Sequence, residues 1–227
     1  MKAKATLKKE CFGKNNPPFI WWFQIKYLYL YRNQLNKIKM GQYYHPIVLN
    51  DKKTQPKAWV YSHDIKFDFK RADGSIYQMG NGLKLMEHSW LRNEFVKAFE
   101  SLILRKPENI VWCGDYADNV KGCKTNLYDR CKDNTKVIPT ERPNLRETRF
   151  VINHDKKEFV DKTKVPTDKD GWRVHPLPLL TCNSNGRGGG DFRGESDLIG
   201  RWAYDKISVD SKKPKGYKEL VFDLVEH

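Results

Sequence analysis

The chain has 227 residues and a formal net charge of +14, from 42 Lys and Arg against 28 Asp and Glu. Hydrophobic residues make up 39% of it and aromatic residues 13%, which is enough for a core and excludes a wholly disordered chain. The basic balance favours polyanionic partners such as nucleic acid or an acidic membrane surface. Residues 1–39 hold nine basic residues against one acid, or +8 of the +14, which leaves +6 for the rest.

Residues 1–39 form a basic, aromatic leader. Its apolar run, Phe19–Tyr31, has thirteen residues and contains Gln24 and Lys26, whereas a membrane-spanning helix needs about 20 residues. No small-residue cleavage site follows, which disfavours a secretory signal. We expect that Met40 is the natural start and that the leader is translated upstream sequence. A membrane-surface anchor is the alternative.

The first half of the body predicts strands followed by a helix. Tyr43–Leu49, Lys57–Ser62 and Ile65–Lys70 have strand patterns, and Asp73-Gly74 is a hairpin-turn signal. Apolar residues then recur at helical spacing from Gly82 to Lys106, with Asn81 as the expected N-cap. Asn109–Cys113 is expected to be a short buried strand.

The second half predicts mainly strands and loops. We expect a long polar insertion over Gly114–Arg146 and a hairpin between Arg149–Asn153 and Glu158–Asp161. Trp172–Cys182 is predicted to be extended because two prolines interrupt it. The last strands are expected at Trp202–Val209 and Tyr217–Val225. The whole indicates a single α+β domain, residues 40–227, with a largely antiparallel sheet packed on one main helix at about 82–106.

The richest functional signal is a glycine loop, Asn183–Gly194, with sequence NSNGRGGGDFRG. Asp191 stands where a dinucleotide-binding fingerprint needs its third glycine, and a phosphate-binding P-loop would need a Gly-Lys-Ser/Thr. Glycine backbone N–H groups can form an anion nest, and arginines can donate to phosphate. The loop therefore predicts a phosphate-bearing ligand, and a surface loop without a ligand is the alternative. The expected ligand-binding residues are Gly186, Arg187, Gly188, Gly189, Gly190, Asp191 and Arg193.

Catalytic candidates are fewer. Asp115 and Asp118 follow a buried strand, where paired acids can hold Mg²⁺ beside a phosphate, although turn or capping roles are the alternative. His63-Asp64 offers an acid–base pair, although a strand-end pair facing solvent is the favoured alternative. If the glycine loop lies near Asp115 and Asp118, a metal and an anion clamp would share one site.

The five cysteines are odd in number and lack the spacing of a secreted small domain, which indicates a reducing, cytoplasmic setting. Cys113, Cys123 and Cys131 are separated by nine and seven residues, not the two to four of a zinc knuckle. Zinc is therefore disfavoured, and no metal ligand is assigned. A buried hydrophobic role is expected for Cys113.

Four stretches resemble an uncharacterised group of proteins encoded by phages and mobile elements of gut bacteria. They are MGQYYHPIVL (40–49), NGLKLMEHSW (81–90), VWCGDYAD (111–118) and LPLLTCNSNGRGGGDF (177–192). The resemblance supports Met40 as the start and implies a phage or mobile-element accessory protein acting inside the bacterial host.

Three functions follow from these patterns. We expect binding of a nucleotide or nucleic acid through the glycine loop. A phosphate-processing enzyme using His63, Asp115 and Asp118 is one alternative. The other is an interaction module that docks a host protein without any small ligand.

Overall fold

The computed structural model describes residues 41–226. The expected leader, residues 1–39, and the expected start at Met40 lie outside these residues.

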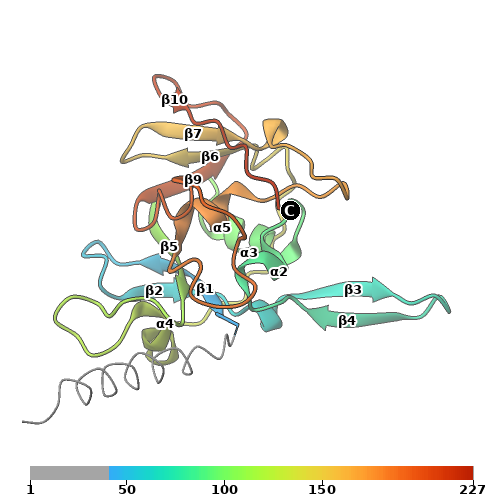
Figure 1. The fold of residues 1–227 in the computed structure, drawn as a ribbon, viewed down its shortest axis with the longest axis horizontal. Helices are drawn as coiled ribbons and strands as arrows, with labels where there is room; N and C mark the ends of the chain where they lie inside the picture. The colour runs from blue at the N-terminus through green and yellow to red at the C-terminus, as the bar shows by residue number, and fades with distance from the viewer. Residues whose placement is uncertain (1–40, 227) are drawn as a thin grey trace, which may run out of the picture. The chain divides into compact units, whose positions relative to one another are not determined.

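The body is built on one mixed sheet of eight strands (Figure 1). Seven of them run in the order β10-β7-β6-β9-β5-β1-β2, and β8 pairs with β5 off this path. Most pairs are antiparallel, but β8 runs parallel to β5 and β10 runs parallel to β7. The bounds are β1 Tyr44–Leu49, β2 Pro56–Trp59, β5 Glu108–Gly114, β6 Phe150–Asn153, β7 Glu158–Asp161, β8 Cys182–Asn183, β9 Lys206–Asp210 and β10 Lys218–Glu219.

The sheet confirms the expected α+β class and its largely antiparallel character. Strand β5 is central, because β1 pairs along one side of it while β9 and β8 share the other. Six of its seven residues are buried, as expected for a strand covered on both faces. The predicted hairpin over residues 149–161 is β6 and β7, and the predicted final strands are shorter in the structure.

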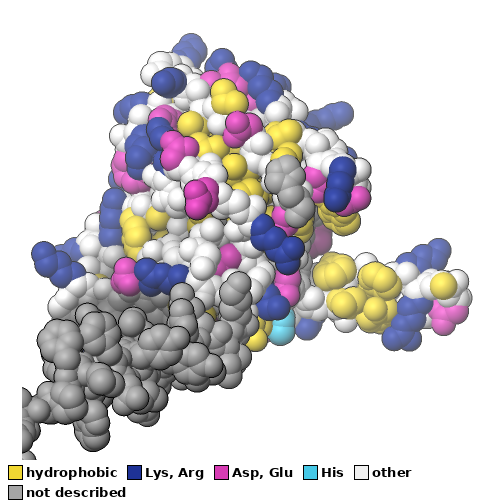
Figure 2. Space-filling model, viewed as in Figure 1, with side chains coloured by type: hydrophobic (Ala, Val, Ile, Leu, Met, Phe, Trp, Pro, Cys, Tyr) yellow, Lys and Arg dark blue, Asp and Glu magenta, His cyan; other side chains and the backbone are white. Residues whose placement is uncertain are grey.

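A second, two-stranded sheet forms an arm that projects from the body (Figure 1). Its strands are β3, Lys66–Lys70, and β4, Ile76–Gly80, and they pair only with each other. The register puts Phe67 opposite Met79 and Phe69 opposite Tyr77 on one face. Phe69 is 45% exposed and Met79 is 38% exposed, and Figure 2 shows hydrophobic side chains gathered along this arm.

The single helix predicted at about 82–106 is wrong in detail, because the segment forms two helices. α2 is Leu85–His88 and α3 is Glu94–Leu102. Between them Arg92 has φ +75°, which no α-helical residue adopts. Asn93 is the N-cap of α3, because its side chain accepts hydrogen bonds from two backbone N–H groups of the first turn. Asparagine side chains commonly bond to the backbone in this way, and asparagine is therefore favoured at helix starts. Asn81, the expected N-cap, donates instead to Ile65 O at 2.7 Å.

α3 supplies the helical side of the main core. Phe95 and Phe99 are fully buried and meet the ring of Trp112 from β5 at edge-on angles. Aromatic pairs in this arrangement stabilise a core by about 0.5–1.5 kcal/mol each beyond the area they bury. The apolar stripe that predicted a helix is therefore the stripe that packs on the sheet.

The prediction of an extended Trp172–Cys182 is also wrong, because residues Pro176–Thr181 form helix α5. His175 is its N-cap and accepts from Leu177 N at 3.1 Å. Pro176 is tolerated because the first turn of a helix has no internal partner for its N–H groups. The predicted polar insertion likewise contains a short helix, α4, Leu127–Arg130. Three 3₁₀ turns complete the structure: η1 Ser62–Asp64, η2 Cys131–Asp133 and η3 Lys162–Lys164.

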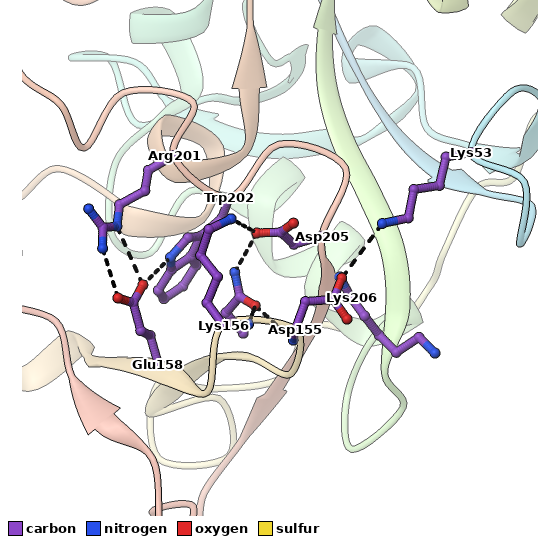
Figure 3. A network of polar contacts seen from close by, with 9 residues as sticks. Lys53, Asp155, Lys156, Glu158, Arg201, Trp202, Asp205 and Lys206 are labelled. Carbon is purple, nitrogen blue, oxygen red and sulfur yellow. Dashed lines mark hydrogen bonds and ion pairs between the residues drawn. The ribbon is translucent and has the colours of Figure 1, made fainter.

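A polar network ties the β6–β7 turn to the residues that lead into β9 (Figure 3). Glu158 accepts from Arg201 Nη2 at 2.8 Å and from the indole of Trp202 at 2.9 Å. Asp205 pairs with Lys156 and accepts from Asn153 Nδ2 at 2.8 Å. The carboxylates of Glu158, Asp205 and Asp155 all have partners here, so the network joins β6 and β7 to the chain before β9.

Candidate functional site

The glycine loop lies between the end of β5 and helix α2. It leaves β8, which runs parallel beside β5. Gly189 forms a bridge with Gly41, and Gly190 O accepts from Met86 N at 2.9 Å. The loop is thus tied on one side to the start of β1 and on the other to α2.

The backbone N–H groups of the loop turn toward the chain's own Asp191. Asp191 Oδ2 accepts from Gly188 N at 3.1 Å, and its other oxygen accepts from Tyr44 Oη at 2.9 Å. The side chain is buried, and burial raises the pKa of this carboxyl in spite of these hydrogen bonds. The anion inside the loop is therefore an internal carboxylate, and an external anion must bind at the rim.

Tyr44 anchors this arrangement from β1. Its ring is fully buried, and its Oη also lies 3.0 Å from Gln42 Oε1. A phenol has a single proton to donate, so Asp191 and Gln42 Oε1 cannot both receive it. No described residue bonds Gln42 Nε2 in this orientation. Rotating the amide by half a turn would let Nε2 donate to Tyr44 Oη, which resolves both conflicts.

Arg187 joins the loop to the acids that follow β5. Its Nη1 donates to Tyr116 O at 2.8 Å and to Asp118 Oδ1 at 3.1 Å. The loop and the segment with Asp115 and Asp118 are therefore neighbours. Both hydrogens of Nη1 are used, while Nε and Nη2 meet no acceptor among residues 41–226. The Arg187 side chain is 48% exposed, so these two nitrogens are open to a ligand.

The side chain of Asp115 is partly buried, whereas that of Asp118 is exposed. Asp115 Oδ1 accepts from Tyr43 N at 3.1 Å. Burial raises its pKa, and the charge of Asp191 adds to that rise. Asp118 is highly exposed and faces Arg187. Within the described part of the chain, no group of three or more His, Cys, Asp or Glu side chains could hold a metal ion.

Lys84, which the sequence did not single out, lies across the glycines. A β-carbon on Gly190 would come within 2.4 Å of Lys84 Cδ, and one on Gly41 within 2.4 Å of Lys84 Cε. Gly190 also has φ +85°, so close approach and backbone conformation both require glycine there. The ammonium of Lys84 pairs with Glu87 at 3.5 Å and adds a cation to the loop edge.

His63 and Arg193 lie apart from this cluster. His63 is exposed on η1 and packs against Tyr61 at a ring distance of 5.3 Å. No described hydrogen bond or ion pair joins His63 to Asp115 or Asp118. Arg193 lines an open cavity of about 520 Å³ between residues 192–198 and 221–225. Among the described bonds, the expected residues that meet within the cluster are Arg187 with Asp118 and Gly188 with Asp191.

Burial keeps the thiols of Cys113 and Cys182 protonated. Cys113 and Cys182 are buried, and burial raises the pKa of each to about 12. A thiol of this kind stays protonated near neutral pH and is a poor nucleophile. This fits the expected hydrophobic role of Cys113.

Among the described helices, α3 is the longest with nine residues, and none is long and apolar enough to cross a membrane. Searches against protein-family models, curated proteins and solved structures returned no match to the chain. The chemistry of the site therefore rests on its own geometry.

Proposed function

We propose that the protein binds a phosphate-bearing ligand, a nucleotide or a nucleic acid, at the rim of the glycine loop. The observation that carries the proposal is Arg187, whose Nη1 is held by Tyr116 O and Asp118 while Nε and Nη2 have no acceptor among residues 41–226. That pair of nitrogens is the side of a guanidinium that binds phosphate with two parallel hydrogen bonds. An arginine already held in place loses less freedom when the ligand arrives.

The surroundings supply further positive charge. Lys84 lies along the same loop, and the chain as a whole is strongly basic. A phage or mobile-element accessory protein in the cytoplasm of its bacterial host would meet nucleotides and nucleic acids there. A phosphate-processing enzyme built on His63, Asp115 and Asp118 has less support, because no described contact links the histidine to the acids.

The proposal is tested by thermal unfolding with nucleotides and by binding of a labelled single-stranded oligonucleotide at several salt concentrations. A nucleotide at 100 times its Kd adds about 2.7 kcal/mol of stability. For the oligonucleotide, Arg187→Gln should weaken binding and reduce the salt slope by about 0.7, the value for one phosphate contact on a single strand.

Arg193→Gln is the matched control, because it also removes one exposed arginine, near the C-terminal end of the loop, but leaves Arg187 and its partners intact. Equal effects of the two substitutions would mean that only net charge matters. A native-like slope for Arg187→Gln would remove the loop from the binding site.

A further inference from the structure

Two tryptophans flank a groove that begins at helix α2 and continues along the residues after it. We call it the tryptophan groove. It consists of two adjoining cavities of about 480 and 380 Å³, which share Leu91, Arg92 and Trp172 in their linings. The larger is also lined by Glu87, Trp90 and Asn93. The smaller is also lined by Leu145, Asp170, Gly171 and Arg173. The ring centroids of Trp90 and Trp172 are 5.6 Å apart and the rings are tilted by 58°. The rings therefore do not face each other as a sandwich, and each offers a separate face.

Trp172 is an exposed ring on a fixed backbone. Its side chain belongs to a residue that is 57% exposed. Its backbone N–H nevertheless donates to Asp168 Oδ1 at 2.7 Å, and its backbone carbonyl accepts from Asp168 N at 2.8 Å. Trp90 is fixed as well, because its indole donates to Met86 O at 2.7 Å. The Trp90 ring and the Trp172 backbone are thus held in place before any ligand arrives, which lowers the entropic cost of binding.

Arg92 adds a cation beside these rings. It is exposed, and its side chain makes no hydrogen bond or ion pair with any other residue in the described range 41–226. Its φ of +75° is costly for a residue other than glycine, and such strain clusters at ligand sites. Glu87 and Asp170 also line the groove, so the lining carries carboxylate acceptors beside its cations.

We propose that the tryptophan groove binds the bases of a single-stranded nucleic acid whose phosphates continue to the glycine loop. Indole faces stack bases of any sequence, carboxylates can accept from N–H donors on base edges, and Arg92 is placed for a phosphate. Met86 links the two sites, since it donates to Gly190 in the loop and accepts from Trp90 in the groove. The inference rests on the proposed function, because it names single-stranded nucleic acid as the ligand of that rim.

The test compares a labelled oligothymidylate with an abasic oligonucleotide of equal length, using fluorescence anisotropy on the full chain. Trp172→Ala should weaken oligothymidylate binding about tenfold or more, the range of one stacked base, and should leave abasic binding unchanged. Trp172→Phe should restore most of the lost affinity. Phe69→Ala is the matched control, because it removes an exposed ring from the arm, and it should bind like the native chain.

Each outcome separates the two proposals. Equal binding of both oligonucleotides, weakened by Arg187→Gln but not by Trp172→Ala, would keep the loop and overturn the groove. Sensitivity to Trp172→Ala alone would keep the groove and overturn the loop. Binding of a neutral oligosaccharide that depends on Trp172 and not on salt would overturn the nucleic-acid assignment. If Trp172→Ala lowers the melting temperature, Trp172→Leu carries the comparison, because it keeps an apolar side chain without an aromatic face; native-like binding of oligothymidylate by this variant would overturn the groove.

Discussion

The indole of Trp112 donates a hydrogen bond of 2.8 Å to Nε2 of His88, and both side chains are completely buried. His88 Nδ1 lies 3.1 Å from Gly82 O, so Nδ1 carries the proton and Nε2 is the acceptor. A second proton, on Nε2 of His88, would place its N–H group against the indole N–H of Trp112 and break this hydrogen bond. Burial accordingly lowers the pKa of His88 to about 4.

This histidine predicts that the fold loses stability in mild acid. The pKa in the unfolded chain is near 6.5 and in the folded protein about 4, so the unfolded chain binds more protons between these values. Stability is full above pH 6.5 and falls as the pH drops toward 4, by about 1.4 kcal/mol per pH unit for this group. Urea unfolding at pH 7, 6 and 5 measures the loss.

Substitution identifies the source of that loss. His88→Gln removes the titrating group and should lower the slope of stability against pH, at the expense of some stability at pH 7. Burial also lowers the pKa of His45, to about 4, and that of His175, so both add to the slope, and substitution of His45 together with His88 should flatten the profile further. An unchanged slope in His88→Gln would contradict the assigned proton position.

A buried ion pair joins α3 to the end of the β6–β7 hairpin. Lys162 Nζ lies 2.5 Å from Glu100 Oε1 and 2.8 Å from Thr148 Oγ1, and His175 Nε2 lies 3.3 Å from the same Glu100 oxygen. Burial alone would raise the pKa of Glu100, but Lys162 and His175 outweigh it and lower the pKa to about 2. The carboxylate is therefore charged and depends on its partners.

We predict that Lys162→Met destabilises the fold by about 3–5 kcal/mol, because it leaves Glu100 as an unpaired buried charge. Adding Glu100→Gln should recover part of that loss, since the double variant buries no charge. A double-mutant cycle by urea unfolding measures the coupling. Additive losses in the double variant would contradict the pairing.

The sequence predicted the parts of the fold whose cause is local. The alternation of apolar and polar residues correctly predicted strand β3. The apolar residues at helical spacing are those with which α3 packs on Trp112. It failed where a side chain redirects the backbone, as at Asn93, or where a proline occupies a first helical turn, as at Pro176. At such points, local hydrogen bonds from side chain to backbone override the structure that the hydrophobic periodicity predicts.

From the sequence, only the candidate residues in the glycine loop and in the segment after β5 could be named. Arg187, Asp118 and Asp191 stand out by residue type and neighbourhood. Tyr44 lies 147 positions from Asp191, and Lys84 is one lysine among many. No spacing rule links residues that meet only through pairing of β1, β5 and β8, so these partners could be found only from the fold.

Two glycines of the loop predict different costs of the same substitution. Gly186 and Gly190 have φ of +79° and +85°, so alanine at either position carries a backbone cost of about 1–2 kcal/mol. A β-carbon on Gly186 meets nothing within 4 Å, whereas one on Gly190 meets Lys84. Gly190→Ala should therefore be the more destabilising in thermal or urea unfolding. Equal losses would show that Lys84 moves aside freely.

Arg92 allows stability and binding to be separated at one position. Arg92→Gly relieves the positive φ but gives the unfolded chain more freedom, so we predict a stability change between zero and a gain of about 1 kcal/mol. Arg92→Ala keeps the backbone strain and should not stabilise. Both variants remove the groove cation and should weaken oligonucleotide binding, with a salt slope reduced by about 0.7. Urea unfolding and anisotropy on the same samples check this pattern. Native-like binding in both variants would show that Arg92 contacts no phosphate, and a loss in Arg92→Gly alone would indicate that backbone rigidity, rather than charge, matters there.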